Sequence, residues 1–425
     1  MASLAADLEF RGLIHQVTDP SLPGRLDGEP LTAYIGFDPT ADSLHVGHLL
    51  QVLMLRRLQL AGHRPIALAG GGTGLIGDPG GKSEERPLLS EEELAANLAK
   101  MRAQLEQFLD FGTGAGGALL LDNGAWLTSL GLIEFLRDVG KHFTVNQMTA
   151  KESVKARLAR PETGISFTEF SYMLLQAYDF LRLYDDHGCR LQLGASDQWG
   201  NITMGIDLIR RMRHQEALGL TTPLVLKTDG TKFGKTESGT VWLDPERTSP
   251  YALYQFLLRS EDAVVGTYLR YFTFLDHDAI QALDAATAEH PERRAAQRAL
   301  ARAVCALVHG DAAASRAEAA AQAIYAGGMA SLDEAMLLEV RRDTPTSDRP
   351  RSALDPPGVP VVDALVDAGL APSKSRARTL VAQGAVSVND RKSDDVDARV
   401  LRSDLLFDRF LVLRKGREYH LVCFE

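Results

Sequence analysis

Apolar and polar positions along the first half of the chain predict short strands and longer helices in turn. Residues 31–37 and 64–70 are apolar runs of strand length, and residues 91–111 have apolar positions at helical spacing behind Ser90, a typical helix N-cap. A later strand is expected at 190–194, directly ahead of another helix. Strands that alternate with helices are typical of a parallel sheet covered on both faces. We therefore expect an α/β fold with a Rossmann-like, parallel-sheet domain.

The pattern changes after residue 221. Residues 223–227 are strand-like, and the polar, glycine-punctuated stretch 231–239 is expected to be a mobile loop. Ala-rich helical periodicity then continues to residue 340, and residues 341–360 contain five prolines. We predict a Rossmann-like domain over 1–222, a connecting segment over 223–248, an all-helical domain over 249–340, a linker over 341–357 and a small α+β domain over 358–425.

The overall charge is acidic, but one stretch is basic. The 425 residues carry a formal net charge of −10 at pH 7, whereas residues 371–392 hold five Lys and Arg against one Asp. An acidic protein with a basic appendage can bind RNA through that appendage. The residues expected to contact RNA are Lys374, Arg376, Arg378, Arg391 and Lys392.

Composition argues against several other classes of protein. Hydrophobic residues make up 45% of the chain, which is ordinary for a globular protein. No apolar run reaches the roughly 18 residues that a membrane span needs, and the first residues lack a signal-peptide pattern. Cys189, Cys305 and Cys423 are far apart, so neither a disulfide framework nor a cysteine zinc site is indicated. We expect a cytoplasmic protein with no membrane partner.

Residues 34–48, YIGFDPTADSLHVGH, carry the most specific chemistry. They run from a strand through a turn into a helix, where His45 and His48 share one face. A helix N-terminus attracts anions, and Gly36 and Gly47 let the backbone approach a ligand closely. The segment therefore predicts a phosphate site. One alternative is a metal site, but two histidines need a third ligand, and the sequence offers no evident partner. The other is a pair of structural histidines, against which the flanking glycines and polar residues argue.

A glycine-rich loop follows the second expected strand. Gly72–Gly77 matches the G-x-G-x-x-G pattern of dinucleotide sites, but the next residues continue as loop where a helix should begin. Residues 81–83 are similar to the end of a P-loop, yet the required first glycine falls on Ile76. We favour a loop that brings Asp78, Lys82 and Arg86 near a polyanion.

Polar side chains recur at positions suited to a ligand. Tyr172, Gln176 and Asp179 are spaced by four and three residues, so they share one face of an otherwise apolar helix. A buried polar stripe needs partners, and a ligand can be one. Residues 194–201 follow a strand, at the edge where open α/β sheets bind ligands. This region offers Gln192, Gly194, Asp197 and Gln198 as contacts.

Residues 232–236, KFGKT, place two lysines and a hydroxyl group in the expected loop. A solvated polar loop without a role is the ordinary interpretation of such a segment. The functional interpretation is a lid that completes a phosphate site during catalysis.

Together these motifs resemble the class I aminoacyl-tRNA synthetases, and specifically the bacterial-type tyrosyl-tRNA synthetase family. HVGH at 45–48 resembles the end of the HIGH signature, and KFGKT resembles KMSKS, with Gly234 in place of a serine, which is usual in the tyrosine branch. SYMLLQAYDF at 171–180 and GASDQWGNI at 194–202 resemble segments specific to that branch. The likeness extends over essentially the whole chain, and the tail resembles a small RNA-binding module shared with a ribosomal protein.

The resemblance implies a reaction and a role for each motif. The carboxylate of tyrosine attacks the α-phosphate of ATP, and the tyrosyl group then passes to the 3′ end of tRNA(Tyr). Mg²⁺ is expected on the nucleotide, and no protein-bound metal is expected. The implied catalytic residues are Thr40, His45, His48, Lys82, Arg86, Lys232, Lys235 and Thr236. The implied tyrosine contacts are Tyr34, Asp78, Tyr172, Gln176, Asp179 and Gln192. The implied ATP or adenylate contacts are Gly36, Asp38, Gly47, Gly194, Asp197, Gln198 and Lys235.

The resemblance also implies partners and specificity. A homodimer is expected, with the apolar segment 131–143 in its interface, and the helical domain is expected to meet the anticodon region. Tyr34 and Asp179 should bracket the phenolic hydroxyl, so phenylalanine would leave both unpaired; tyrosyl-tRNA synthetases are themselves a standard example of this rule. The alternatives are a tryptophanyl enzyme, a catalytically idle RNA-binding protein on this scaffold, and a small-molecule nucleotidyltransferase.

Overall fold

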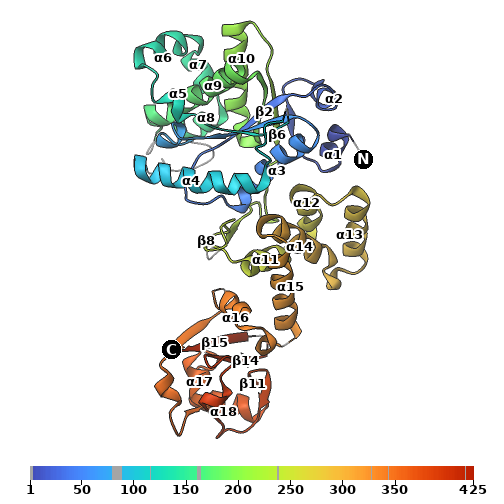
Figure 1. Ribbon diagram of the computed structural model, residues 1–425, viewed down its shortest axis with the longest axis vertical. Helices are drawn as coiled ribbons and strands as arrows, with labels where there is room; N and C mark the ends of the chain where they lie inside the picture. The colour runs from blue at the N-terminus through green and yellow to red at the C-terminus, as the bar shows by residue number, and fades with distance from the viewer. Residues whose placement is uncertain are drawn as a thin grey trace. The chain divides into compact units, whose positions relative to one another are not determined.

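The protein was analysed as a computed structural model that describes residues 3–78, 89–114, 116–159, 164–236, 239–326, 328–342, 344–416 and 418–425. The chain divides into two compact units. Unit 1 comprises Met1–Asp244 and Glu261–Ala296, and unit 2 comprises Pro245–Ser260 and Gln297–Glu425. Figure 1 shows both units and labels many of their elements. In the parts of the chain that are described, no helix is long and apolar enough to cross a membrane.

Unit 1 is built on a six-stranded sheet in the order β1-β6-β5-β2-β3-β4. All neighbouring pairs are parallel except the edge pair of β1 and β6. From β2 the chain adds β3 and β4 on one side, and then returns to add β5 and β6 on the other. Such a reversal opens a crevice at the carboxyl ends of β2 and β5, where ligands of open α/β sheets bind. The strands are β1 (Gln16–Val17), β2 (Thr32–Phe37), β3 (Arg64–Ala69), β4 (Leu119–Asp122), β5 (Cys189–Ala195) and β6 (Leu218–Thr222).

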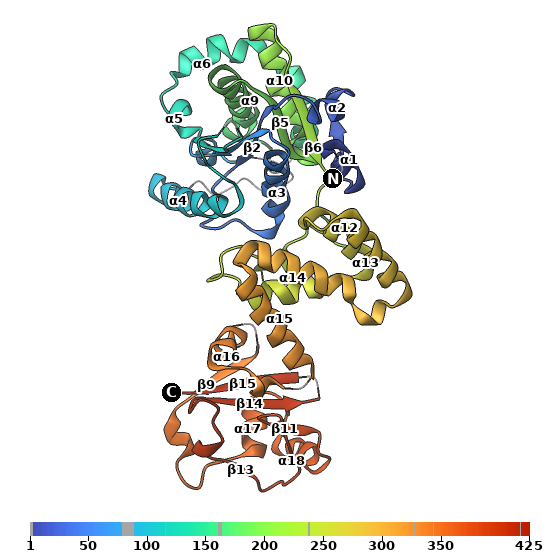
Figure 2. The ribbon, with the colours of Figure 1, turned by 45° about the vertical axis from the view of Figure 1, so that its right-hand side comes forward.

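Helices cover both faces of this sheet. The helices α3 (Val46–Leu60) and α4 (Glu91–Phe108) lie against one face, and α9 (Phe167–His187) and α10 (Trp199–Arg213) against the other (Figures 1 and 2). The predicted Rossmann-like arrangement is confirmed. The unit also contains α1 (Leu4–Phe10), α2 (Leu22–Leu26), α5 (Gly124–Leu127), α6 (Leu132–Asp138), α7 (Val145–Thr149), α8 (Glu152–Leu158), α12 (Asp262–Phe272), α13 (His277–Glu289) and the hairpin of β7 (Lys235–Thr236) and β8 (Gly239–Thr240).

The local sequence explains where α4 begins and where α9 begins and ends. In α4 the Ser90 hydroxyl accepts from the Glu93 amide while the Glu93 carboxylate accepts from the Ser90 amide, which confirms the capping box. In α9 the Ser166 hydroxyl caps the first turn, and Gly188 ends the helix at a φ of 63°, which glycine adopts without strain. The apolar face of α9 packs into the core around Phe180.

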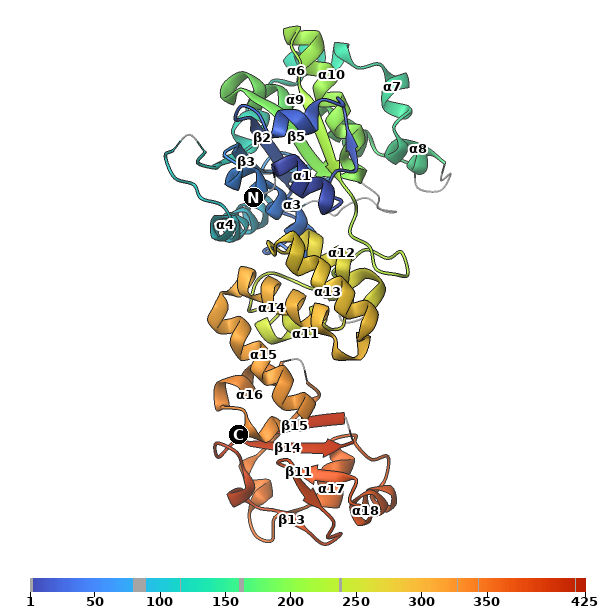
Figure 3. The ribbon, with the colours of Figure 1, turned by 90° about the vertical axis from the view of Figure 1, so that its right-hand side faces the viewer.

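Unit 2 combines helices with a second sheet. Its helices are α11 (Pro250–Leu258), α14 (Ala295–His309), α15 (Asp311–Ala326), α16 (Glu334–Arg341), α17 (Val361–Asp367) and α18 (Lys374–Ala382). The five-stranded sheet has the order β12-β11-β14-β15-β9. Those strands are β9 (Thr346–Arg349), β11 (Val386–Val388), β12 (Arg391–Ser393), β14 (Phe410–Lys415) and β15 (Glu418–Phe424), and β10 (Val359–Pro360) pairs with β13 (Arg399–Val400). Helices α17 and α18 share an apolar core with this sheet (Figure 3).

Two segments differ from their predictions. Part of the expected linker, residues 341–357, forms β9, which pairs in parallel with β15. Its sequence, TSDR, is polar because β9 is an exposed edge strand, so it gave no apolar signal. Residues 223–227 form no strand; the Val225 carbonyl instead accepts from the Phe233 amide, and the chain turns back. The other domain boundaries stay predictions, since helices of the segment 249–340 occur in both units.

Candidate active site

A cavity of about 480 Å³ lies at the crevice between β2 and β5. Residues from six separate stretches of unit 1 line this cavity: 34–51, 68–78, Asn123, 172–179, 193–198 and 223–242. The two histidines, the polar face of α9 and the loop around Phe233 therefore all face the same cavity. The predicted site residues among its lining are Tyr34, Gly36, Asp38, Thr40, His45, Gly47, His48, Asp78, Tyr172, Gln176, Asp179, Gly194, Asp197, Gln198 and Lys232. The topology of the sheet thus brings together most of the residues that the motifs predicted.

His45 and His48 cap the N-terminus of α3. The Gly47 amide donates to Nδ1 of His45 at 3.0 Å, and the His45 amide donates to Nδ1 of His48 at 3.3 Å. The two rings stack with centroids 3.8 Å apart. A side chain at Gly47 would start 2.8 Å from the His45 ring, so glycine is needed there. Because each Nδ1 accepts a hydrogen bond from a backbone amide, the neutral form of each ring carries its proton on Nε2, where it can donate to an anion.

The floor of the cavity pairs a buried phenol with a buried carboxylate. Tyr34 and Asp179 are each only 1% exposed, and the Tyr34 hydroxyl has no hydrogen-bond partner among the described residues. Asn123 Nδ2 and Trp126 Nε1 each donate to Asp179 at 2.8 Å. Burial raises the pKa of Asp179 to about 7 despite these two donors, and burial together with the Asp179 charge raises the pKa of Tyr34. The site therefore holds an acceptor and an unsatisfied hydroxyl side by side.

A second group of polar contacts surrounds Asp38. The Tyr172 hydroxyl donates to Asp38 Oδ2 at 3.0 Å, and the Thr73 hydroxyl donates to Oδ1 at 2.9 Å. A side chain at Gly70 would collide with Asp38 and Thr73, so the strand-to-loop turn needs glycine here. Asp38 is thereby held at the cavity wall in a fixed orientation.

A hydrogen-bonded chain of amides leads to a carboxylate on the opposite wall. Gln176 Nε2 donates to Gln198 Oε1 at 3.3 Å, and Gln198 Nε2 donates to Asp78 Oδ2 at 2.7 Å. Asn201 Nδ2 donates to Gln176 Oε1 at 2.9 Å. Carboxylates and amide oxygens around one end of a cavity suit a cationic group such as an ammonium.

The KFGKT segment reaches the cavity from another direction. Lys232 Nζ lies 4.0 Å from Asp197 Oδ2, and Phe233 and Gly234 line the wall. Burial raises the pKa of Asp197, while the Lys232 charge opposes that change. The backbone of Lys235 and Thr236 forms β7. The positions predicted at Lys82 and Arg86 lie outside the described residues.

Sequence reasoning missed three residues that hold the carboxylates of the site. Asn123 and Trp126 donate to the buried carboxylate of Asp179, and Thr73 donates to the half-buried carboxylate of Asp38, but none of the three was predicted. The signal for Asn123 was its place directly after a strand, at the ligand-binding edge of the sheet. Gln192 is not among the described lining residues; it is 1% exposed and lies beside Tyr34 in the sheet register.

The basic residues predicted to bind RNA all lie in unit 2. Lys374, Arg376, Arg378, Arg391 and Lys392 are exposed. Lys374 pairs with Asp363 at 2.8 Å. The other four residues place exposed guanidinium and ammonium groups on α18 and β12.

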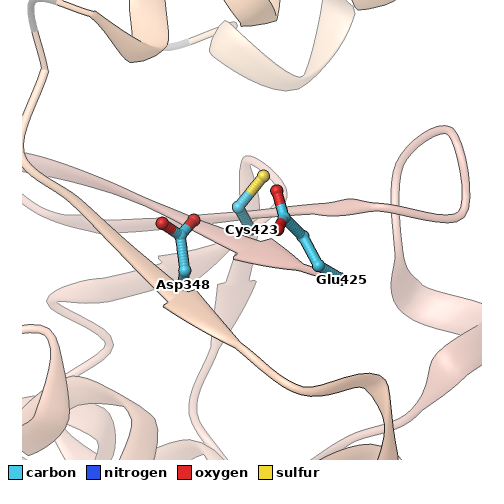
Figure 4. Close-up of side chains that lie close together, drawn as sticks. All are labelled: Asp348, Cys423 and Glu425. Carbon is cyan, nitrogen blue, oxygen red and sulfur yellow. The ribbon is translucent and has the colours of Figure 1, made fainter.

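Three potential metal ligands also meet in unit 2. Asp348, Cys423 and Glu425 lie together on neighbouring strands at the edge of the second sheet (Figure 4). Arg341 pairs with both carboxylates, at 2.7 Å from Asp348 and 3.8 Å from Glu425, and Arg409 pairs with Glu425 at 3.3 Å. Because arginines already balance these charges, the cluster gives no argument for a metal ion.

Comparison with known proteins agrees with this geometry. Residues 26–326 match the family described as tRNA synthetases class I (W and Y), and residues 342–422 match the tyrosine–tRNA ligase SYY-like C-terminal domain. The chain is 56% identical over 423 residues to a tyrosine–tRNA ligase of Roseiflexus castenholzii, with 99% of each chain covered. It is 52% identical over 422 residues to that of Geobacillus stearothermophilus, again with 99% of each covered.

A solved structure supports the same assignment. The C-terminally truncated mitochondrial tyrosyl-tRNA synthetase of Aspergillus nidulans superposes with a TM-score of 0.68 at 33% identity, covering 76% of this chain and 94% of that one. The histidine-capped helix and the cavity at the sheet reversal lie within the matched part of the sequence. The chain therefore belongs to the class I tRNA synthetases of the tryptophan and tyrosine (W and Y) family.

Proposed function

We propose that this chain ligates tyrosine to tRNA(Tyr) at the expense of ATP. The observation that carries the choice of amino acid is the buried Tyr34 hydroxyl, which has no partner among the described residues and lies beside the carboxylate of Asp179. A buried unpaired hydroxyl costs about 1–3 kcal/mol, and the phenol of a bound tyrosine would relieve it by bridging Tyr34 and Asp179. An indole or a phenyl ring offers no such hydroxyl.

The first step joins tyrosine to AMP. A carboxylate oxygen of tyrosine attacks the α-phosphorus of ATP, the bond to the β-phosphate breaks, and diphosphate leaves. The Asp78, Gln176 and Tyr172 group holds the ammonium of tyrosine, so that its carboxylate points at the phosphate. His45 and His48 donate from Nε2 to phosphate oxygens, and Thr40 and Lys232 lie on the same cavity wall. Charge stabilisation by such fixed donors lowers the barrier.

The remaining phosphate contacts are proposed from the motifs. Lys82, Arg86, Lys235 and Thr236 would neutralise the departing diphosphate, and Asp197, Gln198 and the glycines of β2 and β5 would contact the adenosine. In the second step the terminal ribose hydroxyl of the tRNA attacks the tyrosyl carbonyl carbon, and AMP leaves. No side chain forms a covalent bond with substrate.

We propose that ATP enters with Mg²⁺ bound to its phosphates. The carboxylates that line the cavity already accept hydrogen bonds, Asp38 from Tyr172 and Asp78 from Gln198. This favours an ion held mainly by phosphate oxygens and water, which is the usual situation of Mg²⁺ on nucleotides.

We propose that the tRNA is contacted by the basic residues of α18 and β12 and by the helical segment 249–340. We also propose a cytoplasmic location, because translation uses the product.

ATP–diphosphate exchange across a panel of amino acids tests this function. Tyrosine is expected to support exchange, while phenylalanine and tryptophan support it at least about 1,000-fold less efficiently, because each leaves the buried hydroxyl and carboxylate unpaired. Exchange driven by tryptophan would favour the other branch of the family. Absence of exchange with every amino acid would reject the enzymatic function.

The affinity for tyrosine is expected to fall as the pH drops below about 7. Burial raises the pKa of Asp179 to about 7, so at lower pH the empty site holds a carboxylic acid, and the phenol meets a carboxylate only after the proton leaves. The dissociation constant then rises by up to about tenfold per pH unit, and it is constant above pH 7. Tyrosine titrations between about pH 5.5 and 8 measure this, and Asp179→Asn should abolish the step. A flat wild-type profile would contradict it.

We also propose a homodimer that uses the outer face of α6. Leu132 and Ile133 are 69% and 73% exposed, while Phe135 on the same helix packs into the core. A face with exposed apolar residues marks an interaction site, and an isologous dimer needs only one such face. Ile133→Asp is expected to shift the protein from dimer to monomer in sedimentation experiments. Leu60→Asp, at an equally apolar position that is 62% exposed, is the control and should remain dimeric.

A further inference from the structure

The KFGKT segment is bound directly to the first turn of α3 on one side. The Val46 amide donates to the Val241 carbonyl at 3.0 Å, and the Val241 amide donates to the Gly234 carbonyl at 2.9 Å. Gly234 has a φ of 87°, and a side chain there would start 2.5 Å from Val46 Cγ2. This close approach places Phe233 and Gly234 next to the two capping histidines.

On its other side the segment rests on α12. The Phe233 ring is 7% exposed and packs against Tyr268, with centroids 4.5 Å apart, and against Phe272 at 5.3 Å. The Tyr268 hydroxyl donates to the Leu226 carbonyl at 2.8 Å, at the base of the same loop. Burial raises the pKa of Tyr268 to about 12, so the hydroxyl remains a donor. One tyrosine therefore holds the loop by its ring and by its hydroxyl.

Helix α12 is itself fixed to α3 and α1. Arg57 of α3 donates to the Thr273 carbonyl at 2.7 Å, and Arg11 donates to the Thr273 and Leu275 carbonyls at 3.1 and 2.7 Å. Both guanidinium groups are nearly buried and pair with Asp7. Cations at the C-terminus of a helix satisfy its free carbonyls and stabilise its dipole. Helices α3 and α12 thus form one frame, with the KFGKT segment between them.

We propose that Tyr268 is a positioning residue for adenylate formation: its ring seats Phe233 on α12 and so holds Lys232 at a fixed distance from the phosphate site at His45 and His48. The proposal rests on the proposed function. Reaction rates are sensitive to such placement, since a displacement of about 1 Å can cost about 100-fold. The tyrosine pocket at Tyr34 and Asp179 is formed by β2 and α9 instead, so its affinity should not depend on Tyr268.

Tyr268→Leu in the full chain, assayed by tyrosine-dependent ATP–diphosphate exchange, tests this role. We expect kcat to fall about 10- to 100-fold while the KM for tyrosine changes less than about twofold. Tyr268→Phe keeps the ring and should restore kcat to within about threefold of wild type. Tyr271→Leu removes a ring of similar burial from the same helix, packed edge-on to Phe272, and should lower kcat less than about threefold. Thermal unfolding verifies that each variant folds; if Tyr268→Leu does not, Tyr268→Met takes its place.

A double-mutant cycle with Phe233→Leu makes the test specific to the contact between Tyr268 and Phe233. If Tyr268 acts through Phe233, the double variant should be no slower than the slower single variant. The positioning role would be overturned by any of three results: additive losses of kcat in the double variant, an equal loss of kcat in Tyr271→Leu, or a rise in the KM for tyrosine that accounts for the lost efficiency. Wild-type kcat in Tyr268→Leu would overturn it as well, with the proposed function intact. Absence of exchange in the wild type would overturn the proposed function itself.

Discussion

Asp179→Ala is expected to raise the KM for tyrosine about 100-fold in ATP–diphosphate exchange. A hydrogen bond from a neutral donor to a buried carboxylate contributes about 1.5–3 kcal/mol, and its loss here also leaves the donors of Asn123 and Trp126 unpaired. Phenylalanine does not use this carboxylate, so its efficiency should change much less. The preference for tyrosine over phenylalanine should therefore shrink by about the same factor of 100.

Tyr34→Phe tests the neutral partner of the phenol, for comparison with the charged partner that Asp179→Ala removes. It removes the neutral partner of the phenol, which contributes about 0.5–1.5 kcal/mol, and it also relieves the unsatisfied hydroxyl of the empty site. We expect the KM for tyrosine to rise less than about tenfold. The KM for ATP should be unchanged in both variants, because the histidines lie at the N-terminus of α3 and not on β2 or α9. Unchanged discrimination in Asp179→Ala would remove Asp179 from the tyrosine pocket.

The periodicity of the chain predicted these residues because each group lies within one element. Tyr172, Gln176 and Asp179 share a face because helical geometry fixes spacings of four and three, and α9 places all three in the cavity wall. The two histidines stack for the same reason at the start of α3. Alternating strands and helices also predicted a parallel sheet with helices on both faces, whereas the reversal of strand order that opens the crevice is known only from the structure.

Contacts between segments that are distant in the chain could not be predicted from the sequence. Asn123 and Trp126 meet Asp179 only because β4 and α5 fold beside α9, and no local pattern encodes that pairing. The packing of Phe233 against Tyr268 of α12 is a similar case, because about 35 residues separate the two in the sequence. The exposed edge strand β9 was missed because a polar strand has no apolar period. Local patterns thus predicted residues that line the cavity, while long-range packing determines how they are held.

His45→Ala is expected to slow tyrosine-dependent ATP–diphosphate exchange about 100- to 1,000-fold. The Gly47 amide fixes Nδ1 of His45 as an acceptor, so Nε2 carries the proton that can stabilise the phosphate as its charge develops. A donor of this kind contributes mainly in the transition state, so kcat should fall while the KM for tyrosine stays within about twofold. The same substitution removes the N-cap of α3, which costs about 0.5–2 kcal/mol of stability.

His45→Asn separates these two roles of one side chain. Asparagine is among the best N-cap residues, so its carbonyl oxygen can accept from the first turn of α3 and preserve the stability of the helix. Its amide is too short to reach where Nε2 of His45 reaches, so the rate should stay within about tenfold of the alanine variant. Thermal unfolding and exchange kinetics on the same preparations measure both effects. If asparagine restored the rate together with the stability, His45 would be a helix cap and its part in the chemistry would pass to His48.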